Sequence, residues 1–128
     1  MNSVQTDEWA QRVDELVGQC DRNGGAPELL RGLHEILATG PTHICSAIQP
    51  EISRTSLQAL LEAGAFESAA LRLLRNCGYM LSGGGEGMFI ASVVVPLTGR
   101  DFSYSAPSEE LALCGALALS LQECLALG

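Results

Sequence analysis

Residues 79–105 read YMLSGGGEGMFIASVVVPLTGRDFSYS, and this stretch decides the fold class because its apolar side chains recur with a period of two. Three strands are predicted, over 79–82, 88–95 and 101–105. The glycine-rich segment 83–87 between the first two is expected to be a hairpin loop. The middle strand is apolar on both faces, so we expect it to be central and covered on two sides. The last strand alternates Phe102 and Tyr104 with polar residues, which predicts an edge strand with one face in water.

Before this stretch the apolar period is 3.6, which is typical of amphipathic helices. Four helices are predicted there, over 6–20, from Pro27 to Gly40, from Ser53 to Gly64 and over 66–77. Thr6 and Ser53 are expected to cap the first and the third of them. The segment PTHICSAIQPEI at 41–52 is expected to be irregular because prolines bound it.

The order of these elements predicts an α+β fold. An N-terminal helical part, residues 1–64, should pack with a three-stranded antiparallel meander and its flanking helices, residues 65–128. The chain has 128 residues, which is the size of one domain, so we expect a single domain over 1–128.

The final helix is expected to run from Ala106 to about Leu125, and its middle, LALCGALALSL at 111–121, is apolar on every side. Such a helix must be covered on more than one side. The sheet can cover one side, and the other needs either the N-terminal helices or a second copy of the chain. Gly115 is expected to let a neighbouring backbone come close. A tentative interaction surface on this helix comprises Leu113, Leu117, Leu121, Leu125 and Gly115.

The charge balance argues against two classes of partner. The chain has 15 acidic and 7 basic residues and a net charge of −8, so it should repel nucleic-acid phosphates and anionic membranes. All the basic residues are arginine, a composition that indicates a GC-rich bacterial or phage genome. Charged residues make up only 17%, against roughly 25% in an average soluble domain, which suggests a surface for self-association or a protein partner.

The expected location is the cytoplasm. The amino terminus, MNSVQTDEWA, is polar and acidic, unlike a signal peptide. The longest uncharged apolar stretch, 111–122, is shorter than the about 20 residues that span a bilayer. The cysteines are odd in number and contain no C-x-x-C pair, so a disulfide framework is not expected; they are Cys20, Cys45, Cys77, Cys114 and Cys124.

No residue set predicts catalysis, a cofactor or a metal, and we do not expect an enzyme. His43 and Cys45 lie in the 41–52 segment with His34 nearby, but a cysteine nucleophile needs a base and an orienting group, and no flanking motif supplies them. Zinc would need four N or S ligands at recognisable spacing. The GGGEG loop lacks the following helix and the lysine of a phosphate loop. Nothing brings Glu86 and Asp101 together as paired acids.

Residues 66–125 follow the order α-β-β-β-α, with a glycine-rich first hairpin and an alanine- and leucine-rich last helix. In this order the segment, about half of the chain, resembles the double-stranded-RNA-binding domain and the small α-β-β-β-α sandwich domains of phage and prophage proteins. The RNA-binding domain carries a lysine cluster at the start of its last helix. Here that position reads Ser108-Glu109-Glu110-Leu111, so the resemblance implies the fold without RNA binding.

Three functions therefore remain open. The first is a non-catalytic protein-interaction module of a bacterium or phage that self-associates as a homodimer or binds a protein partner. The second is a small-ligand or enzymatic domain with a site around the 41–52 loop or the 83–87 hairpin. The third is an acidic inhibitor or anti-defence protein, which would need its carboxylates to cluster on one face.

Overall fold

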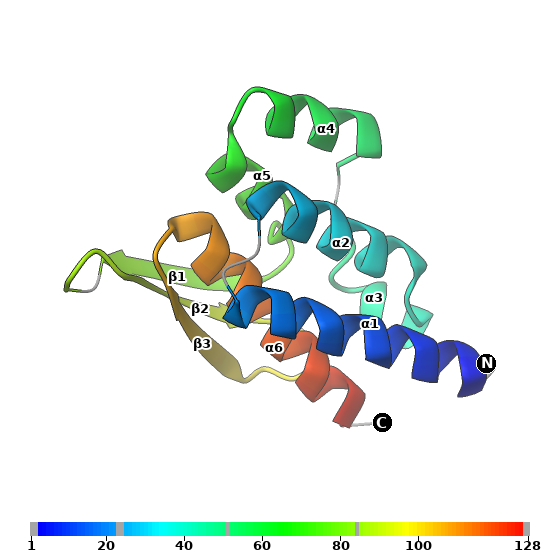
Figure 1. Ribbon diagram of the computed structural model, residues 1–128. Helices are drawn as coiled ribbons and strands as arrows, with labels where there is room; N and C mark the ends of the chain where they lie inside the picture. Colours follow the sequence, from blue (N-terminus) through cyan, green and yellow to red (C-terminus); the bar gives the residue numbers. More distant parts are fainter. Residues whose placement is uncertain (1–2, 23–24, 51, 84, 127–128) are drawn as a thin grey trace.

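The structure is a computed structural model that describes residues 3–22, 25–50, 52–83 and 85–126. Figure 1 shows the elements in these residues, which confirm the α+β class and the α-β-β-β-α order of the second part. The helices are α1 (Ser3–Asp21), α2 (Ala26–Thr39), α3 (Thr42–Cys45), α4 (Arg54–Glu62), α5 (Phe66–Leu73) and α6 (Glu109–Ala126). The strands are β1 (Gly78–Gly83), β2 (Phe89–Val94) and β3 (Asp101–Ala106).

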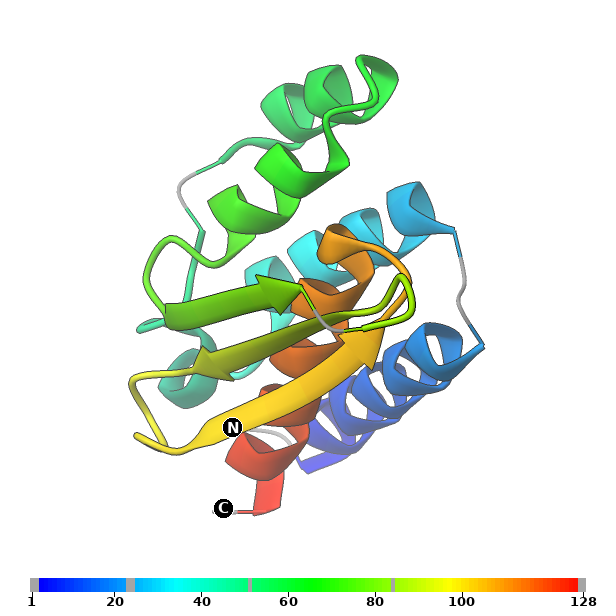
Figure 2. The ribbon, with the colours of Figure 1, turned by 90° about the vertical axis from the view of Figure 1, so that its left-hand side faces the viewer.

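The three strands form one antiparallel sheet in the order β1-β2-β3, so β2 is central and β3 is an edge strand, as predicted. Ala91 lies opposite Leu81 on one side and Tyr104 on the other, and these side chains share the face that packs on α6. No helix that the structure describes covers the other face, which carries Ile90 (Figure 2). The prediction that the middle strand is covered on two sides is therefore wrong, because α6 and the helices packed on it all lie on one side of the sheet.

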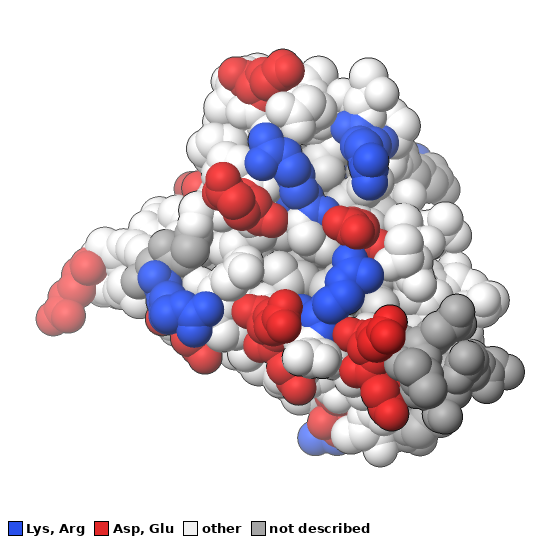
Figure 3. Space-filling view, turned by 45° about the vertical axis from the view of Figure 1, so that its right-hand side comes forward, with Lys and Arg blue, Asp and Glu red and all other residues white. Residues whose placement is uncertain are grey.

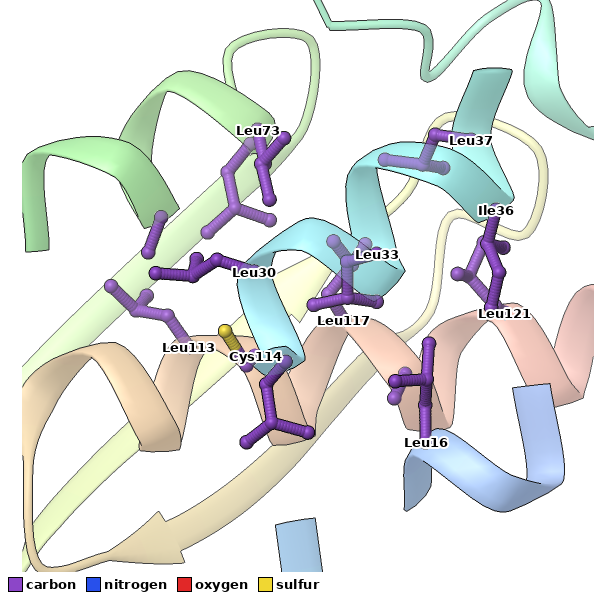
Figure 4. Close-up of a cluster of buried hydrophobic side chains, with 14 of the residues drawn as sticks. Leu16, Leu30, Leu33, Ile36, Leu37, Leu73, Leu113, Cys114, Leu117 and Leu121 are labelled. Carbon is purple, nitrogen blue, oxygen red and sulfur yellow. The ribbon is translucent and has the colours of Figure 1, made fainter. Parts of the chain in front are cut away.

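The question of what covers the apolar last helix is answered within the chain. One side of α6 packs on β2 and β3, and the other packs on α1, α2 and α5. Figure 4 shows Leu30 and Leu33 of α2 lying against Leu113 and Leu117 of α6. Complete burial of a leucine side chain stabilises a fold by about 1.5–3 kcal/mol, so this junction is a main source of stability. The N-terminal helices, rather than a second copy, supply the cover.

Three polar contacts fix α1 on the rest of the core. The buried indole Nε1 of Trp9 donates to the carbonyl of Ile36, 2.9 Å away on α2. The Tyr104 hydroxyl donates to Asp21 Oδ1 at 2.7 Å, which joins β3 to the end of α1. Asp14 Oδ1 accepts from Gln122 Nε2 of α6 at 2.8 Å. The first and last helices thus lie side by side although the whole sheet separates them in sequence.

Several helix ends differ from the sequence prediction. Ser53 caps α4 as expected, since its Oγ accepts from the Ser56 backbone N–H at 3.1 Å. Thr6 is not a cap, because α1 already begins at Ser3. The 41–52 segment is not wholly irregular: the carbonyl of Pro41 accepts the backbone N–H groups of Ile44 and Cys45, and these bonds close the short α3.

Candidate functional site

The tentative interaction residues of the last helix lie in the interior. Leu113, Leu117 and Leu121 are at most 1% exposed, and Leu125 is partly buried against the same core. A partner cannot reach the three buried leucines while the chain is folded. These leucines therefore cannot form the interaction surface that the sequence predicted on this helix. The self-association inferred from the apolar helix needs a different surface.

Gly115 does permit a close approach, but the neighbour is a side chain instead of a backbone. A Cβ built on Gly115 would lie 2.5 Å from Cε2 and Cγ of the Tyr104 ring and closer still to Cδ2. Tyr104 belongs to β3 and faces α6. The absence of a side chain at Gly115 therefore allows the Tyr104 ring of the sheet to pack closely on the helix.

The surface that remains apolar is the sheet and its loops. The exposed large hydrophobic residues among those described all come from residues 79–97; they are Tyr79, Met80, Met88, Ile90 and Leu97. Two of them belong to the face of the sheet that points away from α6. We call this face the open sheet face; it comprises Met80, Ser82, Ile90, Ser92, Val94, Asp101, Ser103 and Ser105. Exposed large apolar side chains that gather in one region of a surface are typical of contact sites in soluble proteins.

The open sheet face has a projection beside a hollow. Met80 projects from β1 with 70% of its surface exposed. Next to it lie Ser92 and Ser103, whose hydroxyl oxygens are 2.7 Å apart across β2 and β3. A hollow of about 350 Å³ opens over this region and is lined by Gly78, Tyr79, Met80, Ser92, Val94, Gly99 and Asp101.

Charge is sparse around this face. Between positions 76 and 99 the sequence contains one charged residue, Glu86, which lies in the hairpin loop. The guanidinium of Arg100 pairs with Glu123 and lies 5.5 Å from the centre of the Phe102 ring, on the side of the sheet that packs on α6. The apolar outer positions of β2 are the sequence signal that could have identified this surface, although the same signal predicted a covered strand.

Cys45, His43 and His34, which lie in and near the 41–52 loop, differ in burial and in hydrogen-bond partner. Cys45 is buried and its Sγ lies 3.8 Å from the carbonyl oxygen of Ile36, whereas His43 is exposed. Burial raises the pKa of the Cys45 thiol to about 11, so the thiol is protonated at neutral pH. His34 Nε2 lies 2.8 Å from the carbonyl oxygen of Ile52 and must carry the proton of that hydrogen bond. Each of the three side chains therefore has different surroundings.

The 83–87 hairpin and the predicted acid pair are also separate. Glu86 has φ 64° and lies beyond the end of the sheet where Gly83 pairs with Phe89. Asp101 pairs with Val94 at the opposite end of the strands. The sheet therefore holds the two carboxylates apart, and β2 rather than a helix follows the loop.

The acidic residues do not form a single block on the side of the molecule that Figure 3 shows. On the side seen in Figure 3, red carboxylates alternate with blue guanidinium groups. Arg12 and Glu35 form one such pair at 3.1 Å. A pair of like charge occurs where α5 and α6 begin: a hydrogen bond with Glu67 raises the pKa of the Glu109 carboxyl. On this side the surface does not resemble the dense carboxylate rows of a nucleic-acid mimic.

Comparison of the chain with protein-family models, with curated proteins and with solved structures gives no match. Among the helices that the structure describes, none is long and apolar enough to cross a membrane. Within the same residues, no group of three or more His, Cys, Asp or Glu side chains could hold a metal ion. The open sheet face is therefore the feature on which a functional hypothesis rests.

Proposed function

We propose that this protein is a non-catalytic protein-interaction module whose open sheet face binds a second copy of the same chain. The observation that carries the proposal is the gathering of exposed large apolar side chains on the sheet and its loops. The five cysteines are free thiols, which supports a reducing cytoplasm as the place where the module works. We also propose that the protein comes from a bacterium or a phage and that it works without a cofactor.

Charge favours a second copy as the occupant of this face. Two chains that each carry −8 repel one another, and the repulsion is smallest where the approaching surfaces hold few charges. The open sheet face has one carboxylate, Asp101, at its edge. Two copies that meet there across a twofold axis bury their apolar residues and keep most of their acidic residues in water.

The shape of the face suits the same occupant. Sheets pack about 10 Å apart with interdigitating side chains. Met80 of one copy can therefore lie over the serine pair of the other, Ser92 and Ser103, and the reverse contact follows from symmetry. Burying the two methionine side chains against each other's sheet stabilises the dimer through apolar area removed from water.

The size of the face predicts a weak dimer. Three strands of six residues cover a footprint of roughly 14 × 20 Å, or about 280 Å². Stable interfaces bury about 800 Å² per partner. The area of this face is smaller than that, even when the additional surface of its protruding side chains is included. We therefore expect a monomer–dimer equilibrium with a dissociation constant of micromolar to millimolar order.

Analytical ultracentrifugation from about 10 μM to 1 mM tests this proposal. The wild-type weight-average mass should rise with concentration, and the double variant Met80→Glu/Ile90→Glu should stay monomeric because it places four carboxylates in the dimer interface. The double control Gln11→Glu/Gln19→Glu adds the same two charges at exposed positions of α1 and should dimerise like the wild type. Circular dichroism checks that all three fold. A wild-type chain that stays monomeric throughout the range would refute the proposal, as would a double variant that still dimerises.

A further inference from the structure

A second hollow, of about 240 Å³, lies between α2 and α4, away from the open sheet face. Each helix contributes positions spaced three and four residues apart, so two helix faces line it. The lining residues are Arg31, His34 and Glu35 of α2 and Arg54, Leu57 and Gln58 of α4. Figure 3 shows blue guanidinium groups in the upper part of the molecule, where these helices lie.

The hollow carries an excess of positive charge in a strongly acidic chain. Its carboxylate, Glu35, lies 3.1 Å from the Arg12 guanidinium, which offsets its charge. Both Arg31 and Arg54 are exposed at the hollow. Two of the seven basic residues of the chain thus border one small concavity, and the acid beside them already has a cationic partner.

The two guanidinium groups keep donors for a ligand. Arg31 uses Nε to donate to Gln58 Oε1 at 3.1 Å, and this bond spans the hollow from α2 to α4. A guanidinium has five N–H donors, so the four on its terminal nitrogens are not used by that bond. Arg54 makes no hydrogen bond or ion pair with another residue that the structure describes.

The walls of the hollow are held in place. His34 donates to the carbonyl of Ile52, which ties the segment before α4 to α2. Ser53 caps α4, so Arg54 lies in the first turn of a capped helix. The amino-terminal end of that helix carries partial positive charge, which adds to the potential from the guanidinium groups.

We propose that the hollow between α2 and α4 binds a small oxyanion, of phosphate or carboxylate chemistry, between Arg31 and Arg54. Planar guanidinium groups bind two oxygens of such anions through parallel charge-assisted hydrogen bonds. Buried Leu57 forms the apolar floor, and the amide of Gln58 holds Arg31 in position. The site differs from the open sheet face in residues and chemistry, so it stands or fails independently of the dimer.

The test is an NMR titration of the ¹⁵N-labelled chain at low protein concentration with inorganic phosphate and, separately, with succinate, at constant ionic strength. Saturable shifts confined to α2 and α4 are expected with at least one of the two anions. The anion that saturates identifies the chemistry. Shifts that grow linearly with both anions, or that spread equally over all the arginines, would show nonspecific ionic contact and would overturn the proposal.

Variants distinguish binding at the assigned arginines from a general effect of the positive charge of the chain. Arg54→Gln should weaken binding roughly tenfold, since it removes a charge-assisted pair of hydrogen bonds. Arg54→Lys keeps the charge but loses the planar fork, so it should weaken binding to an intermediate degree. Arg72→Gln removes the same charge from an exposed position of α5 and should leave binding unchanged. Equal affinity in Arg54→Gln and Arg72→Gln would refute the assigned residues.

Discussion

The packing of the sheet on α6 predicts an unusual result for Gly115→Ala. In most helix interiors this substitution stabilises by up to about 1 kcal/mol, because alanine has the higher helix propensity. Here the new methyl group would overlap the Tyr104 ring, with Cε2 and Cγ only 2.5 Å away. Overpacking of this kind costs about 1–3 kcal/mol. Displacing the ring also strains its 2.7 Å hydrogen bond to Asp21, worth about 1 kcal/mol.

The sum of these contributions is a net destabilisation of about 2 kcal/mol, which for a chain of this length lowers Tm by roughly 7 °C. Thermal and urea unfolding measure it. The control is the Tyr104→Ala background, in which the ring is absent and the same substitution should become stabilising by up to about 1 kcal/mol. The two effects of opposite sign define a coupling of about 3 kcal/mol between the positions. A Gly115→Ala chain that is more stable than the wild type would refute the steric argument.

Three more outcomes follow from the core and its charges. Trp9→Phe should lower the free energy of unfolding by about 1–3 kcal/mol in urea titrations, because the buried Ile36 carbonyl loses the indole donor and keeps the weaker thiol donor of Cys45. Cys45, with a pKa raised to about 11, should resist a thiol reagent at pH 8 in the folded chain and react once urea unfolds it; fast labelling of the native state would contradict this. Glu67→Gln should raise stability slightly at pH 7, since the Glu67 carboxylate raises the pKa of Glu109 by accepting a hydrogen bond from its protonated form and by repelling its ionised form. A raised carboxyl pKa costs the folded chain stability as the pH rises from the ordinary glutamate pKa through the raised one. The gain should therefore shrink as the pH falls through this range and vanish below it, and a gain that is equal at all pH values would count against the pairing.

The elements that depend on local sequence were predictable. Period-two alternation located all three strands to within about two residues, and the Ser53 cap marked the start of α4, because both signals arise within a few positions of one another. Gly64 likewise ends the α4 region with φ 75°, a conformation that favours glycine. Local patterns of this kind are sufficient to predict the fold class.

The features that depend on packing between distant segments were not predictable. The apolar outer side of β2 indicated cover, but whether a helix remains to cover it depends on where every other helix goes. The hollow at Arg31 and Arg54 needs α2 and α4 to lie side by side, and no sequence motif joins these two positions. For α6, the pattern showed that every side is buried without showing by what, so an interface and an interior were equally compatible with it.

The position of α6 at the end of the described chain has a consequence for biosynthesis. As the polypeptide leaves the ribosome, α1, α2 and the sheet emerge before the helix on which all of them pack. Until that helix is synthesised, the apolar sides of the earlier segments have no common surface to bury them. This domain should therefore fold only after the chain has been synthesised through α6, and a nascent chain arrested before Glu109 should be sensitive to proteases and dependent on chaperones.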